Sequence, residues 1–288
     1  MKFRNVMYIV VTVICIIAIG IAVFYQVFKT DNNISSNNNQ NSNNINNEDV
    51  DTKTIDLEKI KSNFNSLFTN KLNLQGYEVP EIIKKLNDSK DVIYTGYEIK
   101  QEKEDKYNLN INLPIFNISS ETANNYNKIT QQVFANKANE IILGTNAEED
   151  VYSIYNIDYT AYLNDNILSL VIRSTLKEGT KAQRVIVQTY NYDLQTAKEA
   201  DLLEILEQKE ISKESVNSKI EEYVTYAYNK SQAVQAATSQ TVYKRDLNSA
   251  IYLVDNVNSF FLGEDGKIYI VYAYGNSNFT SEIDIIEI

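Results

Sequence analysis

The pattern of apolar and polar positions begins with one long hydrophobic run near the amino terminus, Val6–Phe28, which contains no charged residue. A helix rises ~1.5 Å per residue, so this run is long enough to cross a hydrocarbon core of ~30 Å. Lys2 and Arg4 precede the run and Lys29 follows it, so the positive-inside bias places residues 1–5 in the cytoplasm and the chain after Lys29 outside. The pattern predicts an uncleaved signal anchor in a single-pass membrane protein. A cleaved signal peptide is the alternative, but no small-x-small cleavage site precedes the polar stretch.

The stretch that follows, residues 29–54, is rich in asparagine and has few apolar side chains. Such a tract cannot bury enough apolar surface to offset its ordering entropy, so we expect a disordered linker. The cations and anions of residues 1–50 are equal in number, so the whole net charge of −11 belongs to residues 51–288. A domain this acidic repels phosphate backbones and attracts cations, so we expect no nucleic-acid binding.

From residue 55 onward the apolar positions follow helical and strand periods that predict an extracytoplasmic module over residues 55–288. Spacings of three and four residues predict helices over Ile55–Leu72, Pro80–Leu86, Ser120–Leu143, Ala200–Leu206 and Lys213–Lys230. Alternation predicts strands over Val92–Ile99, Tyr107–Leu113, Val151–Leu163, Ile167–Leu176, Arg184–Tyr192, Ser259–Leu262, Lys267–Tyr274 and Glu282–Ile288. Helices and strands are segregated along the chain, which favours an α+β fold of antiparallel sheet with packed helices. A sub-boundary near residues 144–150 is an open alternative to one domain.

Several end signals support these elements. Asp51 or Thr54 is predicted to cap the first helix. The long helix has a serine cap at Ser120 or its neighbour and a terminating Gly144. The tripeptide Asn164-Asp165-Asn166 could supply oxygen ligands to calcium, but no DxDxDG loop is present, so we interpret it as a hairpin turn.

Composition excludes whole classes of chemistry. The chain has no histidine, which excludes a Ser-His-Asp triad and histidine-ligated metal sites. It has one cysteine, Cys15, which excludes an internal disulfide, a thiolate cluster and a CxxC redox pair. The sequence therefore predicts no cofactor and no metal site.

Paired carboxylates are the remaining catalytic option, because a glycosidase needs only two. Candidate pairs are Glu148-Glu149, Glu221-Glu222, and Asp284 with Glu287. A chain with 38 acidic residues is bound to contain such neighbours, so we interpret most of them as solvated surface. The 21 tyrosines are interpreted mainly as packing residues, including Tyr152, Tyr155, Tyr159 and Tyr162 on one predicted strand and Tyr223, Tyr226 and Tyr228 on a predicted helix.

Three segments carry a family resemblance. The run Tyr190–Leu203 (YNYDLQTAKEADLL) resembles the strand, turn and helix signature of the extracytoplasmic domain of RsiV-type anti-sigma factors, which also precedes the catalytic domain of PdaC-type peptidoglycan deacetylases. Ile111–Asn117 and Phe260–Tyr272 agree with this, and the similarity spans roughly residues 90–288. Ala197 stands where the family usually has glycine, so we expect the turn to be rebuilt to avoid a positive φ at this residue.

The resemblance implies a binding module rather than an enzyme. An anti-sigma factor holds its sigma factor with a cytoplasmic segment, for which residues 1–5 are too short, and a PdaC-type deacetylase needs an Asp/His/His metal set on a further domain. In RsiV-type proteins the module recognises lysozyme, so we expect lysozyme, another basic protein, or peptidoglycan as the partner. The alternatives are an envelope-glycan hydrolase using paired carboxylates and a structural accessory of a membrane complex. The sequence assigns no catalytic or ligand-binding residue.

Overall fold

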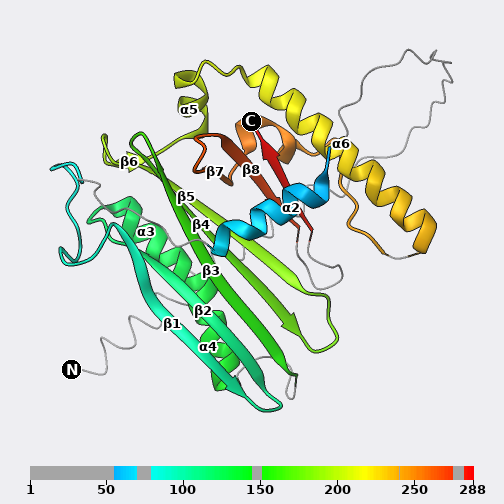
Figure 1. Cartoon of the computed structure of the whole chain (residues 1–288), viewed down its shortest axis with the longest axis horizontal. Helices are drawn as coiled ribbons and strands as arrows, with labels where there is room; N and C mark the ends of the chain where they lie inside the picture. The colour runs from blue at the N-terminus through cyan, green and yellow to red at the C-terminus, as the bar shows by residue number, and fades with distance from the viewer. Residues whose placement is uncertain (1–54, 70–78, 145–150, 240, 275–281) are drawn as a thin grey trace, which may run out of the picture. The chain divides into compact units, whose positions relative to one another are not determined.

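The computed structural model describes residues 55–69, 79–144, 151–239, 241–274 and 282–288. All of them belong to one compact unit, Lys53–Ile288, which contains every described hydrophobic cluster (Figure 1). The predicted membrane segment Val6–Phe28 and linker 29–54 lie outside the described residues. Among the residues that are described, no helix has the length and apolar character needed to span a membrane.

The larger sheet has six strands in chain order: β1 (Ile93–Lys103), β2 (Tyr107–Phe116), β3 (Ser153–Asn164), β4 (Ile167–Glu178), β5 (Arg184–Asp193) and β6 (Lys198–Glu199). The predicted antiparallel meander of β3, β4 and β5 is confirmed. The expectation of a purely antiparallel sheet is wrong, because β2 and β3 run parallel, with Tyr107 opposite Ser153. A parallel pair requires a crossover, which the intervening helix supplies. Strand β2, which precedes the possible sub-boundary at residues 144–150, and strand β3, which follows it, are therefore neighbours in the same sheet.

The crossover helix is long and covers one face of this sheet. It consists of α3 (Glu121–Thr130), a π turn (Gln131–Ala135) and α4 (Asn136–Leu143). Ser120 accepts a hydrogen bond from the amide of Ala123, and Gly144 ends the helix with φ +66°, as predicted. The core beneath it contains the alternate strand residues that the pattern placed inside, among them Tyr107, Leu109, Ile111 and Leu113.

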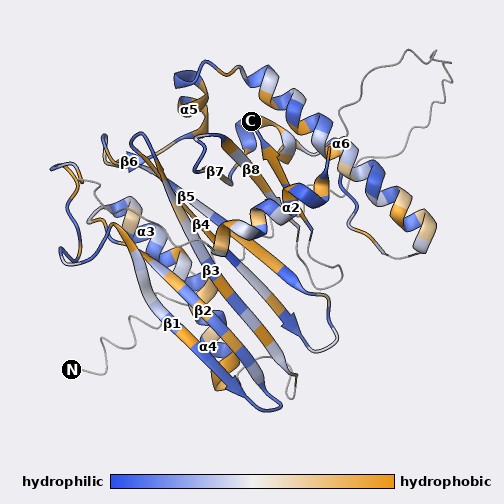
Figure 2. Cartoon of the chain, in the orientation of Figure 1, coloured by the Kyte–Doolittle hydropathy of each residue, from blue (hydrophilic) through white to orange (hydrophobic). Residues whose placement is uncertain are grey.

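The opposite face of the sheet carries a second layer. A three-stranded antiparallel sheet is formed by β7 (Phe260–Leu262), β8 (Ile268–Ala273) and β9 (Ile283–Glu287), and helices α2 (Leu57–Ser66), α5 (Leu202–Gln208) and α6 (Lys213–Thr238) pack with it. Figure 2 shows hydrophobic positions concentrated on the strands of both sheets, whereas α6 is mixed. The observed fold is α+β, with one mixed and one antiparallel sheet.

Buried polar groups fix the position of β7 on the larger sheet. The Asn191 side chain donates to the carbonyl of Phe260 at 2.9 Å, and Ser169 Oγ accepts from the amide of Leu262 at 3.1 Å. Ser169 also donates to Asn191 Oδ1 at 2.7 Å. Buried polar groups are costly unless paired, so these bonds specify one placement of the strand. That placement sets the position of Phe261 between the two sheets.

Two helix predictions need correction. Pro80–Leu86 forms turns rather than a helix, because the surrounding segment is organised by the buried side chain of Asn117, which bonds to the backbone of Asn87 and Asp91. Asp56, rather than Asp51 or Thr54, caps α2 by accepting from the amide of Lys59 at 3.0 Å. Both corrections reflect side-chain bonds that a hydrophobic period does not encode.

The expected rebuilding of the turn after β5 is also wrong. Ala197 has φ +56°, the left-handed conformation that the expectation said it would avoid. The turn is held by Asp193, whose Oδ1 accepts from the amide of Gln195 at 2.7 Å and whose Oδ2 accepts from Thr196 Oγ1 at 2.8 Å. Pairing of β5 with β6 fixes both ends of the turn, so the alanine adopts the strained conformation.

Candidate functional site

A pocket of about 260 Å³ lies between α2 and the three-stranded sheet. Its apolar wall consists of Ile60, Phe64 and Leu67 on the α2 side, Phe261 on β7 and Ile285 on β9. The α2 residues are three or four positions apart, so they lie on one side of the helix, which runs next to β9 (Figure 1). The pocket therefore combines residues from the start of the module with a larger number from its end.

The rim of the pocket is polar and lies mainly on the turn between β7 and β8. Glu264 and Asp265 occupy this turn, and the register of β8 with β9 places Tyr269 opposite Glu287. Asn63 of α2 completes the rim. The sheet register thus brings together carboxylates that are far apart in the sequence.

Gly263 lets the turn between β7 and β8 lie directly against the aromatic ring of Tyr269. A Cβ atom at this position would meet Cε2 of Tyr269 at 2.6 Å, so only glycine lets the ring lie against the turn without a shift. The turn is also bonded to the larger sheet, because Asn164 Nδ2 donates to the carbonyl of Gly263 at 2.6 Å. The predicted hairpin turn at Asn164-Asp165-Asn166 is confirmed, and it contributes to the pocket by holding the rim.

The aromatic wall is a stack of rings. The centroid of Phe261 lies 5.0 Å from that of Tyr269 and 6.2 Å from that of Tyr162, both in near-parallel orientation. The Tyr269 hydroxyl donates to Asp265 Oδ2 at 3.0 Å. Burial first, and then Asp265, raise the pKa of Tyr269 above its usual range, so the hydroxyl stays protonated as a donor. The wall is thus ordered before any ligand arrives.

The rim carries an excess of negative charge. Lys267 forms ion pairs with Glu287 and, at 3.7 Å, with Asp265. Glu264 is exposed and has no ion-pair partner among the described residues. The three rim carboxylates are therefore balanced by one ammonium group, which pairs with two of them, and the rim attracts a further cation.

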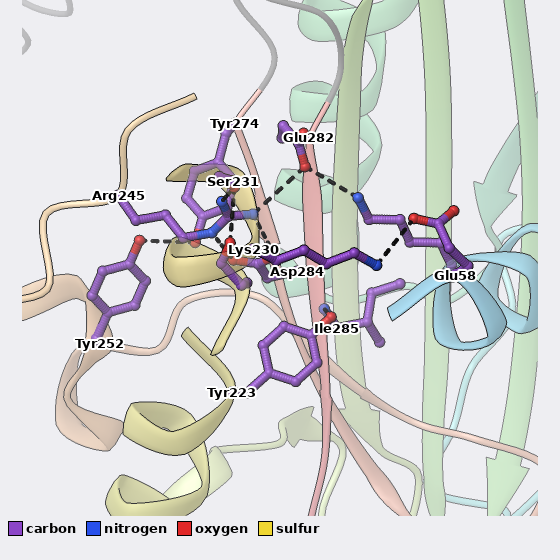
Figure 3. A network of polar contacts seen from close by, with 12 residues as sticks. Glu58, Tyr223, Lys230, Ser231, Arg245, Tyr252, Tyr274, Glu282, Asp284 and Ile285 are labelled. Carbon is purple, nitrogen blue, oxygen red and sulfur yellow. Dashed lines mark hydrogen bonds and ion pairs between the residues drawn. The ribbon is translucent and has the colours of Figure 1, made fainter. Parts of the chain in front are cut away.

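A second polar cluster, shown in Figure 3, is closed and buried. Arg245 binds Asp284 with two bonds, Nε to Oδ2 at 2.6 Å and Nη2 to Oδ1 at 2.8 Å, and the side chains are 2% and 1% exposed. Nη1 of the arginine donates to Ser231 Oγ at 2.9 Å. Burial alone would lower the pKa of Arg245, but the bond and charge of Asp284 raise it. This pair connects the segment after α6 to β9.

Tyrosines surround the buried pair. The hydroxyls of Tyr252 and Tyr274 are 2.9 Å apart, and Tyr223 accepts from the amide of Ile285 at 3.5 Å (Figure 3). Burial, followed by the charge of Asp284, raises the pKa of Tyr274 above its usual range. The interpretation of tyrosines as packing residues is confirmed for Tyr155 and Tyr223, which are 1% and 4% exposed.

A smaller pocket of about 120 Å³ borders this cluster, where α2 meets α6. Lys61 pairs with Glu282 at 3.1 Å, and Lys230 pairs with Glu58 at 3.7 Å. Its charges are thus already matched across the pocket, whereas those of the larger pocket are not. The larger pocket is the better candidate for binding.

The sequence candidates for paired carboxylates do not converge. Asp284 and Glu287 are three residues apart on β9, so their side chains point to opposite faces, one toward Arg245 and one toward the pocket rim. Glu221 and Glu222 are both exposed on α6, and Glu148-Glu149 lies outside the described residues. Within the part of the chain that the structure describes, no cluster of potential metal ligands occurs. The pocket combines Glu287 with acids that were not singled out as candidates.

Comparisons with known proteins find distant structural similarity. No family model and no curated protein matches the sequence. A DUF3298 family protein from Pseudomonas aeruginosa PAO1 is 13% identical with a TM-score of 0.35, covering 74% of this chain and 91% of that one. A DUF3298 family member from Bacteroides fragilis is 13% identical with a TM-score of 0.30, covering 63% and 80%. DUF3298 proteins are related to the RsiV-type and PdaC-type extracytoplasmic domains.

Proposed function

We propose that this chain is a non-catalytic binding module of the bacterial cell envelope, anchored in the membrane by Val6–Phe28, and that its folded domain captures a basic protein. The observation that supports this most directly is the larger pocket, with aromatic rings in its wall and three carboxylates on its rim. Rings and carboxylates together attract the side chains by which a basic protein presents its charge.

The charge of the whole module supports the same function. The net charge of −11 belongs to the folded part of the chain, so a cationic protein is steered toward it over a distance of about one Debye length, ~8 Å at physiological salt. Lysozyme is the first candidate partner, because the sequence resembles the module with which RsiV-type proteins recognise it. Rim charges then select the orientation in which the partner docks.

Binding is better supported than hydrolysis of envelope glycans. Of the acids considered as a catalytic pair, Asp284 is held by two bonds to Arg245 and is closed to solvent. A general acid or base must reach its substrate, which a fully buried and ion-paired carboxylate does not. Glu287 lies near other rim acids, but it is paired with Lys267 on the surface.

The test is a calorimetric titration of purified Lys53–Ile288 with lysozyme at low salt and at ~0.3 M salt, where the Debye length shrinks to ~6 Å. We expect micromolar or tighter binding that persists at the higher salt. A Glu264→Gln variant should bind more weakly than the matched control Glu221→Gln, which removes the same charge from an exposed site on α6. Binding that disappears at high salt, or that weakens equally in both variants, would show only non-specific attraction. Heat with peptidoglycan fragments but none with lysozyme would replace the basic protein by a glycan.

A further inference from the structure

The larger pocket has features that define its ligand more closely, and this inference rests on the proposed function. We propose that the pocket receives a single arginine side chain of the partner, and that Lys267 is a resident cation that this arginine displaces from Glu287. The argument depends on the size of the pocket, on an arginine that the module already binds in a similar way, and on the exposure of Lys267.

The size of the pocket favours one side chain. Its volume is about 260 Å³, below the range of roughly 300–1,000 Å³ that is typical of small-molecule sites. The apolar wall suits the methylene stem of a long side chain, and the polar rim suits a charged tip. Long basic side chains combine these two properties, so the pocket fits the tip of an arginine or lysine better than a sugar chain.

The module already binds one of its own arginines with the groups that the pocket offers. The guanidinium carbon of Arg173 lies 4.2 Å from the ring centroid of Phe68, and Nη1 donates to Asn65 Oδ1 at 2.6 Å. Asp158 Oδ2 lies 3.9 Å from Nη2 of the same arginine. An aromatic ring, an amide oxygen and a carboxylate thus surround this guanidinium beside α2.

The pocket presents the same three groups near the preceding turn of α2. Phe64 supplies a ring from α2 and Tyr269 supplies one from β8. Asn63 supplies an amide, and Glu264 and Glu287 supply carboxylates. Here, however, no guanidinium of a described residue is present among the lining residues. The module is therefore built to bind two guanidinium groups near α2, and it supplies one of them itself.

Lys267 partly neutralises the negative charge of the rim but does not occupy the pocket. Its ammonium pairs with Glu287 and Asp265, yet the side chain is 48% exposed and is not part of the pocket wall. An ammonium is a compact and strongly hydrated point charge, whereas a guanidinium is planar, stacks on rings and binds a carboxylate with two parallel bonds. An incoming arginine therefore competes well for Glu287, and Lys267 returns to water.

The first experiment is an NMR titration of ¹⁵N-labelled Lys53–Ile288 with N-acetyl-arginine amide and, separately, with N-acetyl-lysine amide. We expect the arginine probe to shift the amides of Gly266, Tyr269 and Glu287 and to bind more tightly than the lysine probe. Equal binding of the two probes, or shifts located elsewhere, would overturn the assignment of the pocket to arginine.

The second experiment tests the displacement with the same arginine probe. A Lys267→Met variant should bind it roughly two- to fivefold more tightly, because a competing surface ion pair is removed. The matched control is Lys219→Met, which removes an exposed lysine of α6 that does not line the pocket and should leave affinity unchanged. Weaker or unchanged binding in Lys267→Met would overturn the role of Lys267.

Lysozyme titrations of the same variants separate this inference from the proposed function. If lysozyme binds at ~0.3 M salt and Glu264→Gln weakens it, but its affinity does not respond to Lys267→Met and the arginine probe does not bind in the pocket, the proposed function holds and the assignment of the pocket to an arginine is wrong. If the arginine probe binds in the pocket but lysozyme does not bind at that salt, the arginine site holds and lysozyme is the wrong partner.

Discussion

Strand β9 carries two carboxylates that lie in opposite environments, one buried and one exposed. Asp284 points into the core, where Arg245 binds it with two bonds and neither side chain is more than 2% exposed. Glu287 points to the surface, where its side chain is 52% exposed and pairs with Lys267, which is 48% exposed. The chemistry is the same, an acid with a base, but one pair is closed to water and the other is open to it.

The difference shows that a buried ion pair contributes to the stability of the fold, whereas an exposed ion pair can be exchanged for a ligand. Removing one partner of a buried pair leaves a charge with neither water nor a counterion, so the cost is large. A surface pair gains little because water competes for both charges, which makes it easy to exchange for another cation. The closed pair therefore holds β9 in place, and the open pair is available to a ligand.

The largest effect on stability should come from Asp284→Asn, which keeps the shape of the side chain but leaves the buried Arg245 with only the more distant and more exposed Glu282, at 3.5 Å, as an ion-pair partner. We expect a loss of about 3–5 kcal/mol in the free energy of unfolding. Urea unfolding of Lys53–Ile288, followed by circular dichroism, measures it. A loss below about 1 kcal/mol would mean that water reaches this pair and would remove the contrast with Glu287.

The second test replaces both partners of the closed pair with apolar residues, Arg245→Met together with Asp284→Leu. Because neither a buried charge nor its desolvation cost remains, we expect most of the loss seen in Asp284→Asn to be recovered, about 2 kcal/mol or more. The same urea titration gives the result. If the double variant is as unstable as the single one, the pair also has a packing or bonding role, for example through Ser231.

The side chain of Glu178 is intermediate in burial between those of Asp284 and Glu287, because it is 13% exposed. Lys137 lies at 3.0 Å and Arg184 at 2.5 Å. Burial alone would raise the pKa of Glu178, but the bond and charge of Lys137 and the charge of Arg184 hold it below its ordinary value of 4.5. A lowered pKa in the folded state gives stability that is present above the ordinary pKa and is lost as the pH falls through the folded pKa.

Glu178→Gln should therefore cost stability at neutral pH, by about 1–2 kcal/mol, and the difference from the unsubstituted protein should shrink in acid. Unfolding titrations at pH 7 and about pH 3 compare the two proteins, with the exposed Glu221→Gln as the control. A difference that stays constant between the two pH values would show that the loss comes from packing rather than from ionisation.

The smallest effect on stability should come from Glu287→Gln. The pair that it breaks is half exposed, so the urea midpoint should stay within experimental error of the unsubstituted protein. The affinity for the arginine probe should fall instead, because one rim carboxylate is lost. A large drop in stability together with unchanged affinity would reverse the comparison between the two carboxylates of β9.

Part of the pocket was visible in the sequence. The predicted strands Ser259–Leu262 and Lys267–Tyr274 are confirmed as β7 and β8, and the short connection between them contains two of the rim acids, Glu264 and Asp265. The contribution of Asn63 and Phe64 was not visible, because α2 is separated from this connection by about two hundred residues and nothing local indicates its partner. The pairing of Arg245 with Asp284 was hidden for the same reason, and Asp284 looked equivalent to Glu287.

The sequence by itself determined the positions of most helices and strands, the caps at Ser120 and Gly144, and the exclusion of histidine and disulfide chemistry. These properties depend on composition and on periods of two to four residues, which act locally. The tertiary structure decided that β2 and β3 are parallel, that Ala197 takes a positive φ, and which carboxylate of β9 is buried. These properties depend on contacts between distant segments, where burial and the demand to pair every buried polar group override local preference.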